Sequence, residues 1–283
     1  MRPLTMTLAP FGLAALVAGI WVAAAAAAEP AAKLPRYRLQ VGQELVYSGT
    51  SEFKYKGGEF KDRASWHIWV VRANPDGSWR LILRNGTAFS QDNRSQPEDV
   101  TFAYCDLFPD GRIPDNDSLG FRAQPSSVLP VLPKDEAEAK QGWSQHDGRM
   151  DQTTRYRPLP PPAAADRCAF EVSNESPMDA IYGITSKSVV TFDTQRGLPE
   201  KFESENKQTY GFDGSGKGTT KLDEVMTHDA DWTRQFAAEA DRYFTAGKAY
   251  QDLTRRAGKE TKDAEALLAK EVARSVKGLL GKK

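Results

Sequence analysis

Three histidines are the first residues to consider for acid–base or metal chemistry in this chain. They are His67, His146 and His228, and none stands in an H-E-x-x-H or comparable pair. An imidazole can act as a base, a proton donor or a metal ligand near neutral pH. Because a fold can bring distant residues together, one alternative is a hydrolase-type enzyme that combines scattered residues such as His67, His146 and Asp151. The spacing itself predicts no catalytic residue, metal ligand or cofactor.

The two cysteines, Cys105 and Cys168, are predicted to form a disulfide. Their number is even, and both lie in strand-like patterns. In an oxidising compartment such a bond would close a loop of about 60 residues and stabilise the fold by roughly 4 kcal/mol in the chain-entropy model. The alternative is a pair of buried free thiols. Neither cysteine stands in a C-x-x-C pair, so no redox or zinc role is predicted.

A glycine-rich stretch, residues 211–218, contains the G-x-x-x-x-G-K skeleton of a phosphate-binding loop. Such a loop needs a hydroxyl for magnesium after the lysine and a helix whose N-terminus faces the phosphate. Here Gly218 takes the place of the hydroxyl residue, and the following pattern predicts a strand. The stretch is therefore predicted to be the glycine-rich loop of a hairpin.

Two other short motif matches are also interpreted as structural. Ser51 and Lys54 have S-x-x-K spacing, which requires a helix to bring the lysine to the serine. The local alternation predicts a strand instead, with the two side chains on opposite faces. Residues 115–120 begin like a calcium loop, but Ser126 occupies the position of the bidentate glutamate. A surface loop is preferred there, with a weak calcium site as the alternative.

Residues 1–28 are predicted to be a signal peptide. Arg2 provides a positive start, an apolar stretch follows, and the alanine run that ends at Ala28 offers the small residues that signal peptidase needs. Cleavage near Ala28 would give a periplasmic or secreted protein. The alternative is an uncleaved N-terminal segment that anchors the chain in the membrane.

The composition is that of a folded chain without a strong net charge. Hydrophobic residues make up 40% of the sequence, and 38 basic residues balance 38 acidic ones. A neutral chain has no general electrostatic attraction for nucleic acid or anionic lipid. Nucleic acid is therefore not a predicted partner, and membrane contact is predicted only if the N-terminal segment stays uncleaved.

Residues 29–228 are predicted to form an antiparallel β domain. Trp66 and Ile68 alternate with His67 in the manner of a half-buried strand, and residues 56–59 have the composition of a hairpin turn. Roughly eight to ten such strand candidates follow one another at hairpin spacing. They predict a mainly β fold with a large, curved antiparallel sheet, either a half-barrel or a sandwich.

Residues 229–283 are predicted to form a helical tail, folded as a hairpin of two helices. Apolar side chains recur every three or four residues from Trp232 to Tyr250, Gly258 ends this pattern, and a second helix is expected from about Thr261. The end of the tail is basic. It is a candidate contact for an envelope protein partner, and the alternative is a solvated tail.

Three motifs in the β part resemble those of curved-sheet periplasmic domains related to the bacterial lipoprotein carriers. They are residues 41–47, residues 129–133 leading to Gly142 and Trp143, and residues 191–198. The resemblance implies a concave apolar face that holds a lipid or a peptide. Residues 239–253 resemble the helical region that precedes thioredoxin-like domains in large exported bacterial proteins. Without a C-x-x-C pair, no redox activity is carried over.

The leading hypothesis is an exported cell-envelope protein that is not an enzyme and binds an apolar ligand, such as a lipid, or a protein partner. One alternative is the hydrolase-type enzyme with scattered site residues. The other is a structural or assembly protein that uses its helical tail, residues 229–283, as the contact.

Overall fold

The structure is a computed structural model that describes residues 34–91, 94–114, 128–147, 151–162, 164, 166–175, 179, 181, 183–210 and 213–256. By its internal contacts the chain divides into residues 1–32 and residues 33–283, and all the elements described below belong to the second unit. The predicted signal peptide, the calcium-loop candidate and the second tail helix lie outside the described residues.

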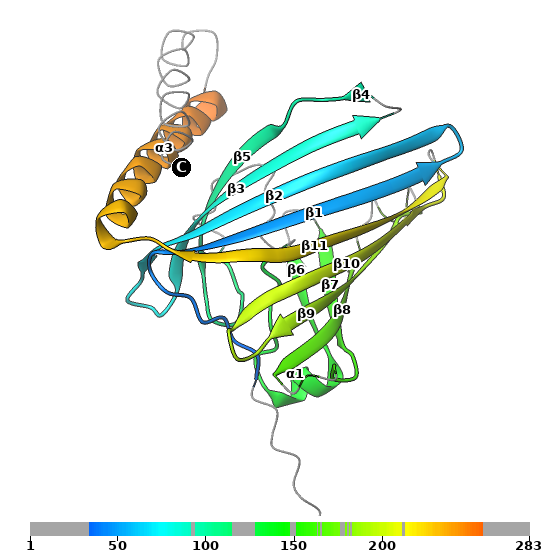
Figure 1. The fold of residues 1–283 in the computed structure, drawn as a ribbon, viewed down its shortest axis with the longest axis horizontal. Coiled ribbons are helices and arrows are strands. Elements are labelled where there is room, and N and C mark those ends of the chain that lie inside the picture. Colours follow the sequence, from blue (N-terminus) through cyan, green and yellow to red (C-terminus); the bar gives the residue numbers. More distant parts are fainter. Residues whose placement is uncertain are drawn as a thin grey trace, which may run out of the picture. The chain divides into compact units, whose positions relative to one another are not determined.

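Eleven strands of the described chain form one antiparallel sheet (Figure 1). Ten of them follow the order β4-β3-β2-β1-β11-β10-β9-β8-β7-β6, and β5 pairs with β3. The strands are β1 (Gln43–Tyr55), β2 (Gly58–Ala73), β3 (Trp79–Gln91), β4 (Arg94–Ser95), β5 (Asp99–Leu107), β6 (Trp143–Asp147), β7 (Gln152–Pro158), β8 (Arg167–Glu175), β9 (Thr185–Asp193), β10 (Leu198–Gln208) and β11 (Gly214–Thr227).

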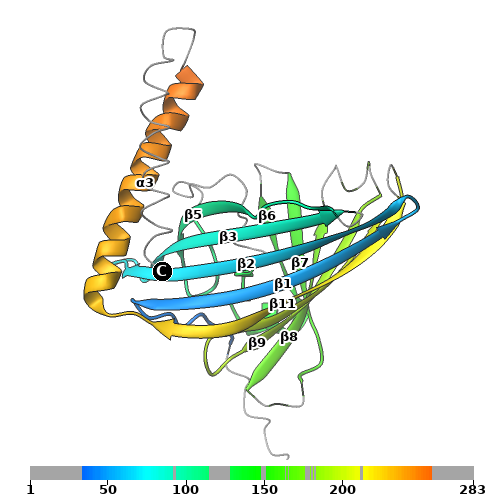
Figure 2. The same ribbon diagram turned by 45° about the horizontal axis from the view of Figure 1, so that its top comes forward.

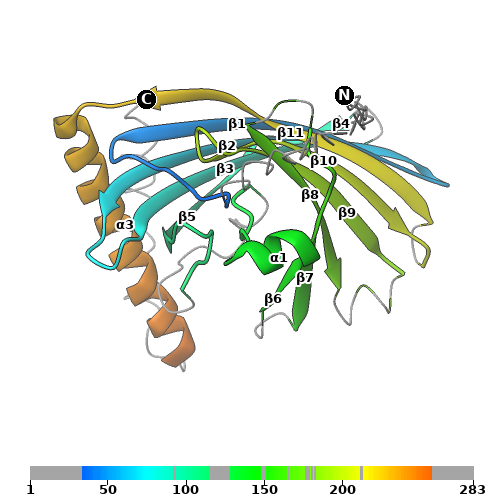
Figure 3. The ribbon, with the colours of Figure 1, turned by 90° about the horizontal axis from the view of Figure 1, so that it is seen from below.

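The predicted mainly β, antiparallel class is confirmed, and the strands belong to a single sheet. Within the described residues the two end strands of this sheet do not pair, so it is not closed. Figure 3 shows that the strands curve around a segment carrying the short helix α1 (Glu136–Gln141). The first and last strands, β1 and β11, are neighbours in the middle of the sheet, in register from Gln43 opposite Thr227 to Tyr55 opposite Gly214.

Turn chemistry explains why consecutive strands pair. Between β2 and β3 the Asn74 N–H donates to the Ser78 carbonyl, and Gly77 has φ +84°, a value that glycine adopts without a steric penalty. The predicted loop at residues 211–218 is corrected in part, because Gly214, Gly216 and Gly218 belong to β11. A Cβ on Gly216 would lie 2.8 Å from Cδ2 of Phe53, so this glycine makes room for the neighbouring ring.

The described chain has a single C-terminal helix, α3 (Ala230–Arg256), where the sequence predicts the first helix of a hairpin. The Asp229 carboxylate accepts a hydrogen bond of 2.8 Å from the Trp232 N–H and so caps the helix start. Figure 2 shows α3 at the end of the strands away from the β1–β2 turn. No helix among the described residues is both long enough and apolar enough to cross a membrane.

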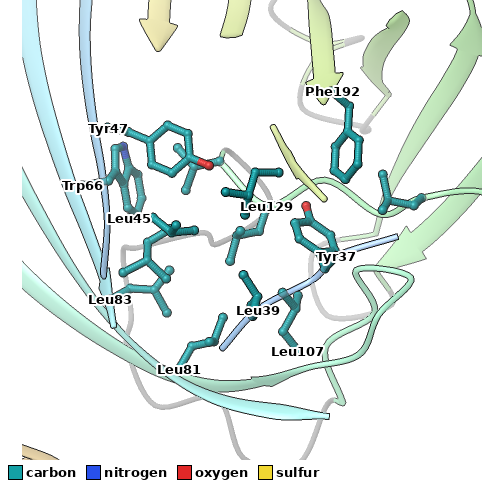
Figure 4. Close-up of a cluster of buried hydrophobic side chains, with 14 of the residues drawn as sticks. Tyr37, Leu39, Leu45, Tyr47, Trp66, Leu81, Leu83, Leu107, Leu129 and Phe192 are labelled. Carbon is teal, nitrogen blue, oxygen red and sulfur yellow. The ribbon is translucent and has the colours of Figure 1, made fainter. Parts of the chain in front are cut away.

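The main apolar core lies on one face of the sheet, which we call the inner face. The sheet has two flanks, β1 to β5 and β6 to β11, and both contribute to this core, with Leu45 and Tyr47 from β1 and Phe192 from β9. The segments around Tyr37 and Leu129 pass between these flanks and fill the space (Figure 4). Tyr37 packs edge-on against Phe192, with ring centroids 5.6 Å apart. Its hydroxyl donates to the Pro130 carbonyl at 2.9 Å, which ties the two filling segments together.

A smaller apolar cluster lies on the opposite, outer face, beneath α3. Trp69 from β2 contacts Phe236 of the helix at 4.8 Å between ring centroids, and Tyr104 from β5 contacts Phe244 at 4.5 Å. Ile82, Phe102 and Ala240 complete the buried part of this cluster. The stripe of apolar residues that the sequence places on the helix is therefore turned toward the sheet of the same chain.

The predicted disulfide is corrected by the structure, since Cys105 and Cys168 are both free thiols. Cys105 lies on β5 and Cys168 on β8, with β3, β2, β1, β11, β10 and β9 between them in the sheet. Both side chains take part in the inner core, whose filling segments occupy the space between the flanks. Burial raises the pKa of the Cys105 thiol to about 12 and that of Cys168 to about 11.

Candidate functional sites

A buried carboxylate joins two of the three histidines. Oε1 of Glu44 lies 2.6 Å from Nδ1 of His67, and Oε2 lies 2.6 Å from Nε2 of His228. Only 6% of the Glu44 side chain is exposed. The three residues come from the start of β1, from β2 and from the segment between β11 and α3. We call this group the His–Glu–His joint, because it links the sheet to the start of the helix.

Aromatic rings hold both histidines of the joint in place. The His67 ring stacks on Trp69 at 5.5 Å, and the His228 ring stacks on Trp232 at 3.8 Å between centroids. Burial alone would raise the pKa of Glu44, but hydrogen bonds from His67 and His228 outweigh it and hold this pKa below its ordinary value. Glu44 is therefore a buried carboxylate whose charged form is stabilised by its two neighbours.

The structure does not assemble the predicted hydrolase residues. His146 lies on the edge strand β6, where its Nδ1 contacts Oγ1 of Thr153 at 3.2 Å, and Asp151 lies in the turn that follows with φ +47°. His67 contacts Glu44 instead. Within the described part of the chain, no three His, Cys, Asp or Glu side chains are grouped in a way that could hold a metal ion.

The S-x-x-K residues lie on opposite faces of β1, as predicted. Ser51 faces inward and donates a hydrogen bond of 3.1 Å to Asp62, while Lys54 pairs with Glu52 at 2.8 Å. Burial raises the pKa of Asp62. Since the serine hydroxyl and the lysine ammonium point away from each other, this pair has no geometry for nucleophilic catalysis.

The inner face, where the resemblance implies a ligand cavity, is filled near the core. Leu39, Leu129 and Leu132 are each at most 5% exposed. Leu39 and Leu129 occupy the region between the flanks (Figure 4). They come from segments outside the sheet, which close over its apolar side chains. The space that a lipid would need is thus taken by the chain's own residues in this part of the inner face.

A hollow lies on the outer face of the sheet, toward the end opposite α3. Its volume is about 540 Å³, and it extends over β9, β10, β11 and β1. Glu52 and Lys54 are an even number of residues from Glu44 along β1, which places them on the same outer face. The charged residues that line the hollow are Lys54, Lys187, Lys207, Lys217, Glu52 and Glu205.

The register of the strands places these charged side chains in rows that run across the sheet. Directly paired positions give a row of alternating sign across four strands, from Lys187 to Glu205, Lys217 and Glu52. Lys217 and Glu205 form an ion pair of 2.8 Å. Opposite charges at paired positions attract one another, so the row favours this register. A second row runs beside it, from Lys207 to Ser215 and Lys54.

Sequence reasoning missed both the joint and the hollow. On β9, β10 and β11 the charged residues of the hollow alternate with small or polar residues, which indicates an exposed face but not which strands become neighbours. The sequence around Glu44 gives no indication of its role, because its partners come from β2 and from the segment between β11 and α3. A comparison of the chain with models of known protein families and with curated proteins found no match.

Proposed function

We propose that this protein is an exported component of the cell envelope that binds a protein partner and is not itself an enzyme. The single observation that carries the partner-binding role is the charged hollow on the outer face. It measures about 540 Å³ and opens to the surface rather than being enclosed, so a segment of a partner can reach the side chains that line it. Export is proposed from the N-terminal segment with its charged start, apolar middle and alanine-rich end.

Two features favour a protein partner over an apolar ligand. Near the core, the apolar side chains of the inner face are covered by Tyr37, Leu39 and Leu129 of the same chain. The hollow, by contrast, is lined by lysine and glutamate side chains, whose charged ends suit a polar partner while their methylene stems offer apolar contacts beside them. An apolar ligand bound at the core would require the filling segments to move out of it.

The binding surface is proposed to lie on the sheet rather than on the apolar stripe of the tail. That stripe packs against Trp69, Phe102 and Tyr104, so its aromatic side chains already have partners within the chain. The Tyr104 hydroxyl also donates to Asp241 of α3 at 3.1 Å. A contact through α3 would therefore have to use its other, more polar side.

Site-specific photo-crosslinking tests this function. A benzophenone amino acid is placed at Thr185, which lines the hollow, and in a matched variant at Ser144, an exposed residue of β6. In cells that export the protein, we expect Thr185 to give a discrete protein adduct that mass spectrometry identifies. Ser144 should give no such adduct. The absence of an adduct at Thr185, or the same adducts at both positions, would contradict a partner surface in the hollow.

A further inference from the structure

The second row of the hollow places a hydroxyl between two ammonium groups. Lys207 pairs in register with Ser215, and Ser215 pairs in register with Lys54 on the other side. Directly opposed side chains in a sheet have their Cβ atoms about 5 Å apart, so the two lysines flank the serine within reach of one bound group. Ser215 is exposed and can donate its hydroxyl proton.

The charges of the hollow do not cancel. Its lining has four lysines against two glutamates. The glutamates are engaged, because Glu52 pairs with Lys54 at 2.8 Å and Glu205 with Lys217 at 2.8 Å. These contacts lower the pKa values of both carboxyls and keep them ionised. Within the described part of the chain Lys207 has no ion-pair partner, so its positive charge remains available.

We infer that the hollow recognises an extended, acidic segment of the protein partner, whose carboxylates lie over the row formed by Lys207, Ser215 and Lys54. This inference rests on the proposed function of the hollow as a partner surface. The occupant follows from charge complementarity, because a net positive lining attracts carboxylates and repels basic segments. Lys207 and Lys54 stand two strand spacings apart, about 10 Å, which a short extended peptide can span.

A carboxylate of the partner can replace Glu52 as the counter-ion of Lys54, because exposed ion pairs are weak. An exposed lysine–carboxylate pair contributes only about 0–1 kcal/mol, so Lys54 can leave Glu52 for an incoming carboxylate at low cost. Such binding is weak for each contact and depends on several of them. The binding affinity should fall steeply as salt is added, because the lysines of the hollow are exposed to solvent and salt screens their charge.

Peptide titration of the full-length exported protein tests the inference. Fluorescently labelled hexaglutamate and hexaglutamine are titrated at low salt, and anisotropy reports binding. We expect hexaglutamate to bind and hexaglutamine not to bind, with affinity falling as sodium chloride is added. The substitution Lys207→Glu should weaken hexaglutamate binding by about fivefold or more, since it replaces an attractive charge by a repulsive one.

The matched control is Lys201→Glu on the same strand and the same outer face, outside the hollow. It causes the same change in net charge and should alter binding by less than about twofold. Circular dichroism checks that both variants are folded. Equal binding by the wild type and Lys207→Glu, or an equal loss in both variants, would overturn the inference, as would an absence of hexaglutamate binding.

The crosslinking experiment separates this inference from the proposed function. A Thr185 adduct that excess hexaglutamate suppresses supports both. An adduct that persists in excess hexaglutamate and in the Lys207→Glu background leaves the partner surface in place but overturns the acidic segment. If Thr185 gives no adduct, the proposed function itself fails.

Discussion

At the scale of single residues, Glu44 is a buried charged group with a close partner on each carboxylate oxygen. It is nearly inaccessible, yet each of its carboxylate oxygens lies 2.6 Å from an imidazole nitrogen. A buried charge is tolerated when such partners surround it, and removing one member leaves the others without a counterpart. The joint is therefore expected to contribute more to stability than the surface pairs of the sheet.

Replacement of Glu44 by alanine should lower the free energy of unfolding by about 2–4 kcal/mol, because two partly buried imidazoles lose their acceptor. Urea unfolding followed by tryptophan fluorescence measures the change. The control is Glu224→Ala, which removes an exposed glutamate from β11 and should change stability by less than about 0.5 kcal/mol. Equal effects of the two substitutions would contradict a structural role for the joint.

The joint also predicts how stability depends on pH. Since the pKa of Glu44 is lowered in the folded state, its contribution is present above the unfolded value of 4.5 and is lost as the pH falls through the folded value. The melting temperature of the wild type should thus fall on acidification below about pH 4.5 more steeply than that of Glu44→Gln. Parallel pH profiles of the two proteins on acidification from neutral pH would argue against this assignment.

At the scale of elements, α3 packs against the β domain, although the sequence places it in the C-terminal tail. Its first half covers the outer face of β2, β3 and β5, and the Asp229 cap and the joint fix its start. A network reinforces this contact at the sheet edge, where Arg80 donates to both carboxylate oxygens of Asp106 and also pairs with Tyr104. The helix is thus held by packing in its middle and by polar contacts at its start.

Removal of the Phe236 ring should weaken the packing of α3 on the sheet without unfolding the sheet itself. Phe236 packs against Trp69 and Trp232, with ring centroids 4.8 Å from each. Replacement by alanine should cost about 3–4 kcal/mol of this packing. Hydrogen exchange should then become faster in residues 230–246 while β1 and β11 stay protected. The exposed neighbour Gln235→Ala is the control, and exchange that rises equally in the helix and the central strands would contradict separate docking.

At the scale of the whole domain, non-covalent packing across the inner face joins the two flanks of the sheet. Tyr37, Leu39 and Leu129 lie between them, and each buried apolar side chain of this kind contributes roughly 1.5–3 kcal/mol. No disulfide joins the flanks in the structure, since Cys105 and Cys168 are free thiols. The domain therefore depends on the segments that fill its inner face.

Alkylation without reductant should show two free thiols. Both cysteines have raised pKa values from burial, so the native protein should react with iodoacetamide slowly and the urea-unfolded protein rapidly. Mass spectrometry of the unreduced, unfolded protein should find two added groups. A mass without added groups that appears modified only after reduction would show that a disulfide forms.

The strands, the turns and the start of α3 could be predicted because their causes are local. Alternation of apolar and polar residues requires neighbours only two positions away, Gly77 allows its own turn, and Asp229 caps the helix that follows it. The pairing of β1 with β11 could not be predicted in this way, because many antiparallel orders satisfy the same alternation. An even count of cysteines likewise does not tell which strands carry them or where the sheet order places those strands, and both thiols are free in the structure.

Residue order alone was enough to predict a β-rich chain with hairpin turns and a capped C-terminal helix. The N-terminal signal segment stays a prediction. Three features depended on the folded arrangement: Glu44 meets His67 and His228, loop segments fill the inner face, and lysines and glutamates from four strands share a hollow. The difference arises from the range of the interactions. Backbone preferences and alternation act over a few residues, whereas burial and charge pairing join whichever strands the sheet order makes neighbours.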